Sequence, residues 1–236
     1  MVFLHGWSCD RSYLDPQFEH FAAAHRVATA DLRGHGQSSS PEPAPGVYSV
    51  GTLADDVLAV AQDASLEQPI MVGHSLGALV ALTCGARQGT VRAVVMIDPA
   101  PIVNAPVKEF LGQSAVVVEQ DEDASWRRGF ANGWFLPTDT ARRSEIIQGM
   151  SALAPNIAAA SLRAIADFDG AAALRTVDVP LLSIGSAVPT DNPADLRDAC
   201  PTITIGQTVG SGHFNHLEVP DQVNLMIERF LAINGF

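Results

Sequence analysis

The sequence predicts an α/β fold, with a mostly parallel sheet of about six strands flanked by helices. Short apolar runs end in turn or glycine residues and alternate with stretches of helical periodicity, which is typical of buried parallel strands. The chain has 236 residues, of which 47% are hydrophobic and 17% are charged. This composition supports one large buried core and excludes a disordered chain.

Six apolar runs are the expected strands, and apolar residues at helical spacing predict the helices between them. The strands are expected at residues 2–4, 26–30, 69–72, 91–97, 179–184 and 202–205. The helices are expected at residues 16–24, 50–64, 76–87 and 222–233.

A helical insertion separates the fourth and fifth expected strands. Residues 101–178 carry helical stretches without a strong strand signal, whereas residues 1–100 and 179–236 carry the expected core. An insertion here predicts a cap over the carboxyl edge of the sheet, where open α/β sheets bind ligands. Four aromatic residues of this cap are candidate pocket walls, and packing within the cap explains them equally well. They are Trp126, Trp134, Phe130 and Phe135.

The strongest catalytic motif is Gly73-His74-Ser75-Leu76-Gly77, between an apolar strand and a helix of small residues. This context predicts a sharp turn that exposes Ser75 as a nucleophile, rather than an ordinary strand–helix junction. The two glycines avoid collisions with the neighbouring strand and helix. The backbone N–H of Leu76 is expected to face a developing oxyanion, and His74 is expected at the substrate pocket.

A second motif, Leu4-His5-Gly6-Trp7, directly follows the first strand. A loop at this point can supply a second oxyanion donor, and the backbone N–H of Trp7 is the expected one. The Trp7 side chain can form a pocket wall at the same time, because the donor is a backbone group. For His5 we expect a structural role, in which hydrogen bonds hold the loop, rather than direct catalysis.

His213 is the expected base, because it lies on a glycine-flanked loop after the last strand. A serine hydroxyl is a weak nucleophile until a base takes its proton, and histidine suits this role near pH 7. His216 competes for the role, but its position just before the final helix favours capping or loop packing. The base must lie on the loop that reaches the elbow, which favours His213.

Two aspartates compete for the acid that orients the histidine. Asp98 directly follows the strand at 91–97, whereas Asp191 lies six residues beyond Gly185 on a polar loop. Groups at strand ends are held more precisely, which favours Asp98. The alternative roles are a cap of the following segment for Asp98 and a solvated loop residue for Asp191.

Together these motifs resemble the α/β-hydrolase superfamily over nearly the whole chain outside the cap. Asp31-Leu-Arg-Gly-His-Gly-Gln-Ser38 adds to the resemblance. The resemblance implies a triad of Ser75, Asp98 and His213 that cleaves a carboxylic ester or lactone of a small neutral or apolar substrate. No metal or other cofactor is expected.

Two departures from the superfamily pattern bear on this reading. Many relatives carry their acid three residues after the glycine that corresponds to Gly185, and Val188 stands there in this chain, which also favours Asp98. Most relatives begin with two further strands, so the strand at 26–30 is expected at the edge of the sheet. Either a truncated N-terminus or a dispensable hairpin would explain this difference.

A narrower resemblance, to cofactor-free dioxygenases that cleave 3-hydroxy-4-oxoquinolines, supplies an alternative function. It rests on Gly6-Trp7-Ser-Cys-Asp10, the 186–192 loop and the placement of Asp98. In those enzymes a His–Asp pair acts as a base on the substrate hydroxyl. Cys9 and Leu76 stand where that group has histidines. A non-catalytic ligand-binding relative is the third reading, and the intact Ser, His and Asp set argues against it.

Charge and composition narrow the expected partners and compartment. A net charge of −12 repels phosphate backbones and anionic lipids, so we expect a small-molecule substrate and neither nucleic-acid nor membrane partners. Three widely spaced cysteines, no membrane-length apolar run and no visible signal peptide predict a cytoplasmic protein. The expected exposed edge strand favours a homo-oligomer.

Overall fold

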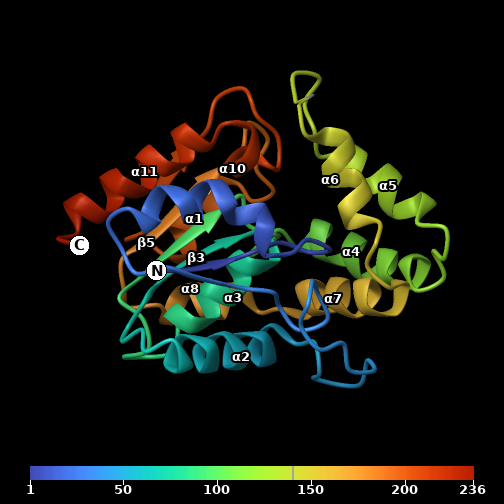
Figure 1. The fold of residues 1–236 in the computed structure, drawn as a ribbon, viewed down its shortest axis with the longest axis horizontal. Coiled ribbons are helices and arrows are strands. Elements are labelled where there is room, and N and C mark those ends of the chain that lie inside the picture. Colours follow the sequence, from blue (N-terminus) through green and yellow to red (C-terminus); the bar gives the residue numbers. More distant parts are fainter. Residues whose placement is uncertain (140) are drawn as a thin grey trace.

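The computed structural model describes residues 1–139 and 141–236, and six strands within them form one sheet (Figure 1). Its order is β2-β1-β3-β4-β5-β6, and every neighbouring pair is parallel. The strands are β1 (Val2–Leu4), β2 (Ala28–Ala30), β3 (Ile70–His74), β4 (Ala93–Ile97), β5 (Leu181–Gly185) and β6 (Thr204–Gln207). The predicted α/β fold is confirmed, with the 26–30 strand at an edge as expected.

Burial along the strands follows their place in the sheet. The four central strands are buried throughout, as a parallel sheet covered on both faces requires. The edge strands β2 and β6 are partly exposed. Five strands begin one or two residues later than predicted. Two of them, β3 and β5, begin just after Pro69 and Pro180, because proline has no N–H to donate to a ladder.

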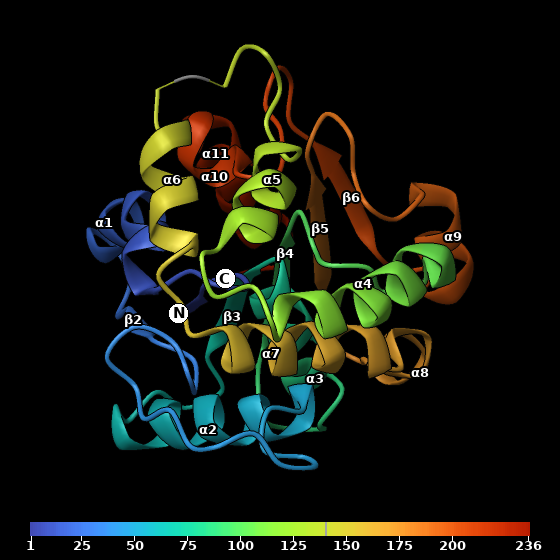
Figure 2. The ribbon, with the colours of Figure 1, turned by 90° about the vertical axis from the view of Figure 1, so that its right-hand side faces the viewer.

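Helices cover both faces of the sheet (Figure 2). One face packs against α1 (Asp15–Ala22) and α11 (Pro220–Ile233), and the other against α2 (Val50–Asp63) and α3 (Leu76–Gly85). Alternate strand residues serve the two faces, so Phe3 faces α1 and α11. The short helices are η1 (Arg11–Leu14), α8 (Gly170–Thr176), α9 (Pro193–Ala199) and α10 (Asn215–Glu218).

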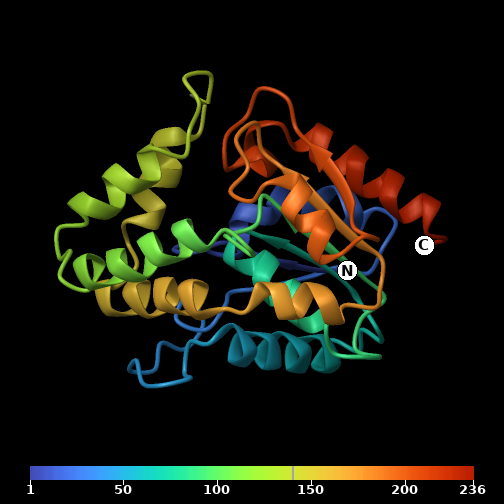
Figure 3. The ribbon, with the colours of Figure 1, turned by 180° about the vertical axis from the view of Figure 1, so that it is seen from behind.

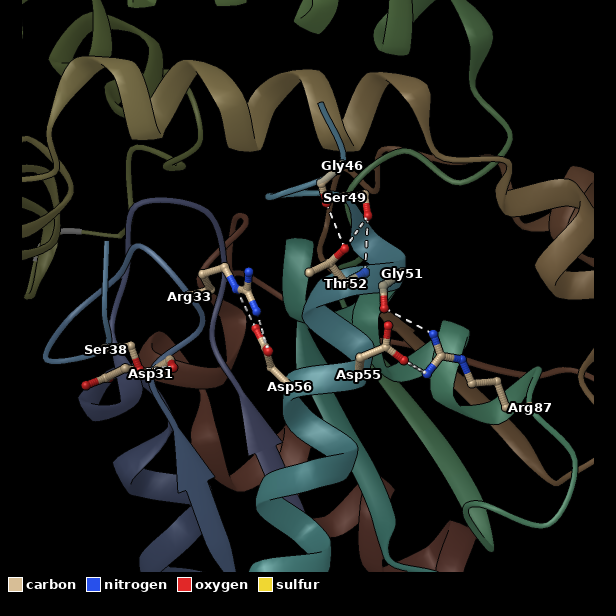
Figure 4. Close-up of polar contacts among 10 residues, drawn as sticks. All are labelled: Asp31, Arg33, Ser38, Gly46, Ser49, Gly51, Thr52, Asp55, Asp56 and Arg87. Carbon is tan, nitrogen blue, oxygen red and sulfur yellow. Dashed lines mark hydrogen bonds and ion pairs between the residues drawn. The ribbon is translucent and has the colours of Figure 1, made fainter. Parts of the chain in front are cut away.

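Polar contacts anchor α2 to the loops around it (Figure 4). Ser49 Oγ accepts a 3.1 Å hydrogen bond from the Thr52 N–H and so caps the helix. Arg33 forms a bidentate ion pair with Asp56, in which Nε donates to Oδ2 at 2.8 Å and Nη2 donates to Oδ1 at 2.7 Å. These contacts fix α2, which packs against α3, the helix that follows Ser75.

Within the described residues, the first four helices after β4 form the cap, and they lie together at one end of the molecule (Figure 3). They are α4 (Ala105–Val118), α5 (Ser125–Asn132), α6 (Arg143–Met150) and α7 (Pro155–Asp167). The following helix α8 contacts α3 and α9, so it belongs to the helical layer of the core. The predicted cap of residues 101–178 therefore ends earlier than expected. In the described residues, no helix combines the length and apolar character needed to cross a membrane.

Candidate active site

Ser75 lies on a strained turn between β3 and α3, with φ of 53° and ψ of −116°. A positive φ is costly for a residue with a Cβ, so the surrounding packing must hold this conformation. The glycines of the motif permit that packing. A Cβ on Gly73 would lie 2.1 Å from the Gly77 carbonyl oxygen, and a Cβ on Gly77 would lie 2.3 Å from that of Leu4. The geometry agrees with the predicted elbow.

His213 and Asp98 form a close pair at the same edge of the sheet. His213 Nδ1 and Asp98 Oδ2 are 2.6 Å apart, and the Asp98 side chain is 2% exposed. Asp98 Oδ1 accepts a second hydrogen bond, of 2.6 Å, from the Ser186 N–H. A carboxylate at Nδ1 holds the proton on that nitrogen, which leaves His213 Nε2 to act as a base.

Asp191, the competing acid, faces the cap instead of His213. Its carboxylate accepts hydrogen bonds of 2.8, 2.9 and 2.9 Å from the backbone N–H groups of Ile102, Val103 and Asn104. Burial raises the pKa of Asp191, and these three bonds act in the opposite direction. Because residues 102–104 lead directly into α4, Asp191 anchors the start of the cap.

His216, the competing base, is fully buried within α10 and does not line the cavity beside Ser75. Burial, followed by the nearby His213, lowers the pKa of His216 to about 3. The imidazole is therefore neutral near pH 7. Its ring centroid lies 4.1 Å from that of His74, so His216 is a packing residue, as its sequence position suggested.

His74 corrects a prediction, because it does not line the cavity beside Ser75. Successive strand residues point to opposite sides, so the residue before Ser75 points away from the pocket. The ring is buried between His213 and His216, and its Nε2 donates a 3.0 Å hydrogen bond to the His213 carbonyl oxygen. Burial, followed by the neighbouring histidines, lowers the pKa of His74 well below its usual value. His74 thus supports His213 from beneath as a neutral donor.

Two backbone N–H groups near Ser75, those of Trp7 and Leu76, make no backbone hydrogen bond within the described part of the chain. The Leu76 N–H is the first of α3, and the first N–H groups of a helix have no partner inside it. A Cβ on Gly6, the residue before Trp7, would lie 3.1 Å from the Ser75 Cβ, so this loop lies directly beside the elbow. Both amides can therefore act as oxyanion donors.

His5 orients the Trp7 amide through hydrogen bonds, which is the structural role expected for it. The Leu32 N–H donates to His5 Nε2 at 2.9 Å, so the proton of this neutral ring lies on Nδ1. Nδ1 then donates to the Gly6 carbonyl oxygen at 2.8 Å. That carbonyl and the Trp7 N–H belong to one planar trans peptide and point in opposite directions. Holding the carbonyl therefore holds the donor.

A cavity of about 450 Å³ lies between the sheet edge and the cap, and Ser75, His213 and Asp98 all line it. No lysine, arginine or glutamate of the described residues lines this cavity. Its apolar walls from the cap include Phe110, Phe130, Trp134, Phe135, Leu162 and Ile165. The candidate wall residue Trp134 lies in this lining. Trp126 lies outside it and packs against Phe130, with ring centroids 4.8 Å apart.

Sequence reasoning missed the cap residues that hold the loop of His213. The His213 N–H donates to the Trp134 carbonyl oxygen at 3.0 Å. Asp139 Oδ2 accepts a 2.8 Å hydrogen bond from the Gly212 N–H. The glycine before His213 was a signal of a close backbone approach, but nothing in the sequence named its partner. Among the described residues, no cluster of metal-binding side chains is present.

Comparisons with known proteins agree with the fold. A family model described as "Alpha/beta hydrolase family" matches residues 1–224. The 2-(acetamidomethylene)succinate hydrolase of Mesorhizobium japonicum is 31% identical over 112 residues, which are 47% of this chain and 39% of that protein. The 3-oxoadipate enol-lactonase 2 of Acinetobacter baylyi is 25% identical over 97% of this chain and 86% of its own length.

Coverage and structural likeness differ among the relatives. The matches to the Mesorhizobium protein, an ethanol acetyltransferase and a probable alcohol acetyltransferase each span less than half of the relative's length. A thermophilic esterase from Thermogutta terrifontis shares the fold, with a TM-score of 0.83 and 20% identity over 99% of this chain and 89% of that one. On the family match, this chain belongs to the alpha/beta hydrolase family.

Proposed function

We propose that this chain is a serine hydrolase that cleaves a carboxylic ester or lactone of a small, uncharged and largely apolar substrate. One observation carries the proposal: Ser75 on a strained elbow and the His213–Asp98 pair line the same cavity. A nucleophile, a base and an orienting acid in one pocket are the components of acyl transfer.

The reaction would proceed through an acyl-enzyme. His213 Nε2 takes the Ser75 proton as the serine oxygen attacks the substrate carbonyl, and the Trp7 and Leu76 amides stabilise the resulting oxyanion. When the ester C–O bond breaks, His213 returns the proton to the leaving alcohol. His213 then takes a proton from water as the water oxygen attacks the acyl group. When the bond between the acyl group and the serine oxygen breaks, His213 returns that proton to Ser75 and the acid leaves. Asp98 offsets the imidazolium charge in both halves of the cycle.

The lining of the cavity supports the substrate class. Apolar cap residues surround the catalytic groups, and the described lining contains no lysine or arginine that could pair with a substrate carboxylate. The net charge of −12 also disfavours highly anionic substrates. Relatives named as an enol-lactonase and a putative esterase/lipase support a lactone or ester. A small-molecule substrate without nucleic-acid or membrane partners, a homo-oligomeric state and a cytoplasmic location stay predictions.

Covalent labelling tests the proposal. A fluorophosphonate probe should label the wild type and not Ser75→Ala. The matched control is Ser183→Ala, which removes a hydroxyl from the buried strand β5 outside the cavity and should be labelled like the wild type. Turnover of a short-chain p-nitrophenyl ester should fall at least about 10³-fold in Ser75→Ala. Labelling that survives the loss of Ser75 would contradict the proposal.

The alternative of a cofactor-free dioxygenase would use the same His213–Asp98 pair without Ser75. The strained elbow and the two unpaired amides beside Ser75 serve acyl transfer, whereas a base acting on a substrate hydroxyl needs neither. The two reactions differ in one measurement. Oxygen uptake with a hydroxy-oxoquinoline that is lost in His213→Ala but retained in Ser75→Ala would favour the dioxygenase.

A further inference from the structure

The loop that carries His213 is bonded to residues 134–139 of the cap, which we call the cap turn. The His213 N–H donates to the Trp134 carbonyl oxygen at 3.0 Å, and the Gly212 N–H donates to Asp139 Oδ2 at 2.8 Å. The same Asp139 oxygen accepts a 2.7 Å hydrogen bond from the Leu136 N–H. One carboxylate oxygen therefore joins the backbone of the cap turn to the loop of His213.

The contact between the loop of His213 and the cap turn is buried and close, so it fixes the position of the loop relative to the cap. Asp139 is 2% exposed, and Gly212 is buried. A Cβ on Gly212 would lie 2.3 Å from the Trp134 carbonyl oxygen and 2.8 Å from Asp139 Oδ2. Hydrogen bonds from backbone N–H groups to an ionised carboxylate are stronger than neutral ones. The loop and the cap turn thus meet through direct hydrogen bonds, one to a backbone carbonyl and one to the Asp139 carboxylate.

The His213 backbone is held from two sides. On the core side, His74 Nε2 donates to the His213 carbonyl oxygen at 3.0 Å, while Asp98 holds the imidazole. On the cap side, the cap turn holds the His213 N–H and the preceding residue, and the Trp134 ring centroid lies 4.9 Å from that of His213. The core anchors sit at the ends of β3 and β4, whereas the cap anchor sits between two helices (Figure 2).

We infer that Asp139 is a positioning residue for His213, so that the cap completes the catalytic geometry as well as walling the pocket. The inference rests on the proposed serine-hydrolase function. Asp139 does not line the cavity, so it acts through the loop and not on the substrate. Because a misplacement of about 1 Å can cost about 10²-fold in rate, a loosened loop should impair proton transfer from Ser75.

Two substitutions distinguish the loss of the hydrogen-bond acceptor at residue 139 from the loss of its negative charge. Asp139→Ala removes the acceptor and leaves unpaired the buried N–H of Gly212 and the partly buried N–H of Leu136. Asp139→Asn removes the charge but keeps one side-chain oxygen. Placed where Oδ2 lies, this oxygen can accept the hydrogen bonds of both the Leu136 and the Gly212 N–H groups. The control is Asp123→Ala, because Asp123 is an exposed cap carboxylate that accepts the Ser125 N–H and does not contact the loop.

The experiment measures the rate at which a small fluorophosphonate labels Ser75, together with kcat and KM for a p-nitrophenyl acetate substrate. In Asp139→Ala we expect the labelling rate and kcat to fall about 10- to 100-fold, with KM changed by less than about threefold. Asp139→Asn should restore both rates, and Asp123→Ala should match the wild type. Thermal unfolding of each variant verifies that it is folded.

Wild-type labelling rates in Asp139→Ala, or a change confined to KM, would overturn the inference. A wild type that is not labelled at all would instead contradict the proposed function, so the two failures are distinguishable. If Asp139→Ala does not fold, Asp139→Ser gives the same comparison, because its hydroxyl is too short to reach the Gly212 N–H. Full labelling of that variant would equally refute the role.

Discussion

Two buried aspartates follow neighbouring strands at the same edge of the sheet, and they face different partners. Asp98 directly follows β4, and its carboxylate accepts one backbone N–H, from Ser186, and contacts the His213 imidazole. Asp191 lies six residues after β5, and its carboxylate accepts three backbone N–H groups from residues 102–104. The first carboxylate acts on a side chain, whereas the second holds the backbone at the start of the cap.

The direction in which each carboxylate points accounts for this difference. Both oxygens of Asp191 accept backbone N–H groups at the start of the cap, and neither contacts an imidazole in the described part of the chain. Asp98 has one such donor, so its second oxygen is available to His213. The comparison teaches that residue type and burial do not by themselves identify a catalytic acid. Substitutions at the two sites should therefore affect different properties, activity at Asp98 and stability at Asp191.

The largest expected effect is on the activity of Asp98→Asn. An asparagine can donate a hydrogen bond to His213 Nδ1 and thereby favour the tautomer that cannot accept the Ser75 proton. We expect kcat to fall about 10³- to 10⁴-fold, by analogy with the corresponding change in a serine protease. The measurement is kcat for an ester substrate, with thermal unfolding as the control for folding. If Asp98→Asn kept nearly the wild-type kcat while Asp191→Asn lost activity, the roles assigned to the two aspartates would be reversed.

The next effect is on the stability of Asp191→Ala. Three backbone N–H groups lose a buried acceptor, which should lower the free energy of unfolding by about 2–4 kcal/mol. The kcat of the folded protein should stay within about tenfold of the wild type, since the His213–Asp98 pair is intact. Denaturant unfolding measures the first quantity. Asp195→Ala, at an exposed aspartate of α9, is the matched control and should change neither.

A smaller effect is expected for Asn104→Ala, next to the Asp191 anchor. Asn104 caps α4 by accepting the Val107 N–H, and its Nδ2 donates to the Thr190 carbonyl oxygen at 2.7 Å. Loss of the cap should cost about 1 kcal/mol of stability without lowering kcat. Asn104→Asp keeps the capping oxygen but cannot donate to the Thr190 carbonyl oxygen, so it should recover only part of the loss. A large decrease in kcat would show that the start of the cap influences the site.

The smallest expected effect is a pH dependence of the stability that Asp191 contributes. Burial raises the pKa of Asp191, so the folded state binds this proton more tightly than the unfolded state does. Its stabilising contribution is therefore complete below the unfolded value of about 3.9 and is lost as the pH rises through the folded pKa. The stability of the wild type relative to Asp191→Asn should decrease over that interval. An increase would mean that the three backbone donors outweigh burial.

Local patterns predicted most of the fold and part of the candidate site. Apolar runs located all six strands, because strands in a sheet covered on both faces consist mostly of apolar residues. The spacing of Gly73, Ser75 and Gly77 predicted the turn, since steric constraints there act within a few residues. Placement at a strand end favoured Asp98, and the structure sets Asp98 beside His213. His74 was misplaced, because the alternation of strand residues turns it away from the pocket.

The sequence by itself determined the order of strands and helices, the elbow at Ser75 and the loops that carry the other candidate catalytic groups. These features depend on contacts between residues close in the chain or on simple burial. Tertiary structure alone decided that Asp191 anchors the cap and that Asp139 reaches the loop of His213. Those contacts join residues about 70 to 90 positions apart, and hydrogen bonds at such separation depend on packing, which leaves no local pattern.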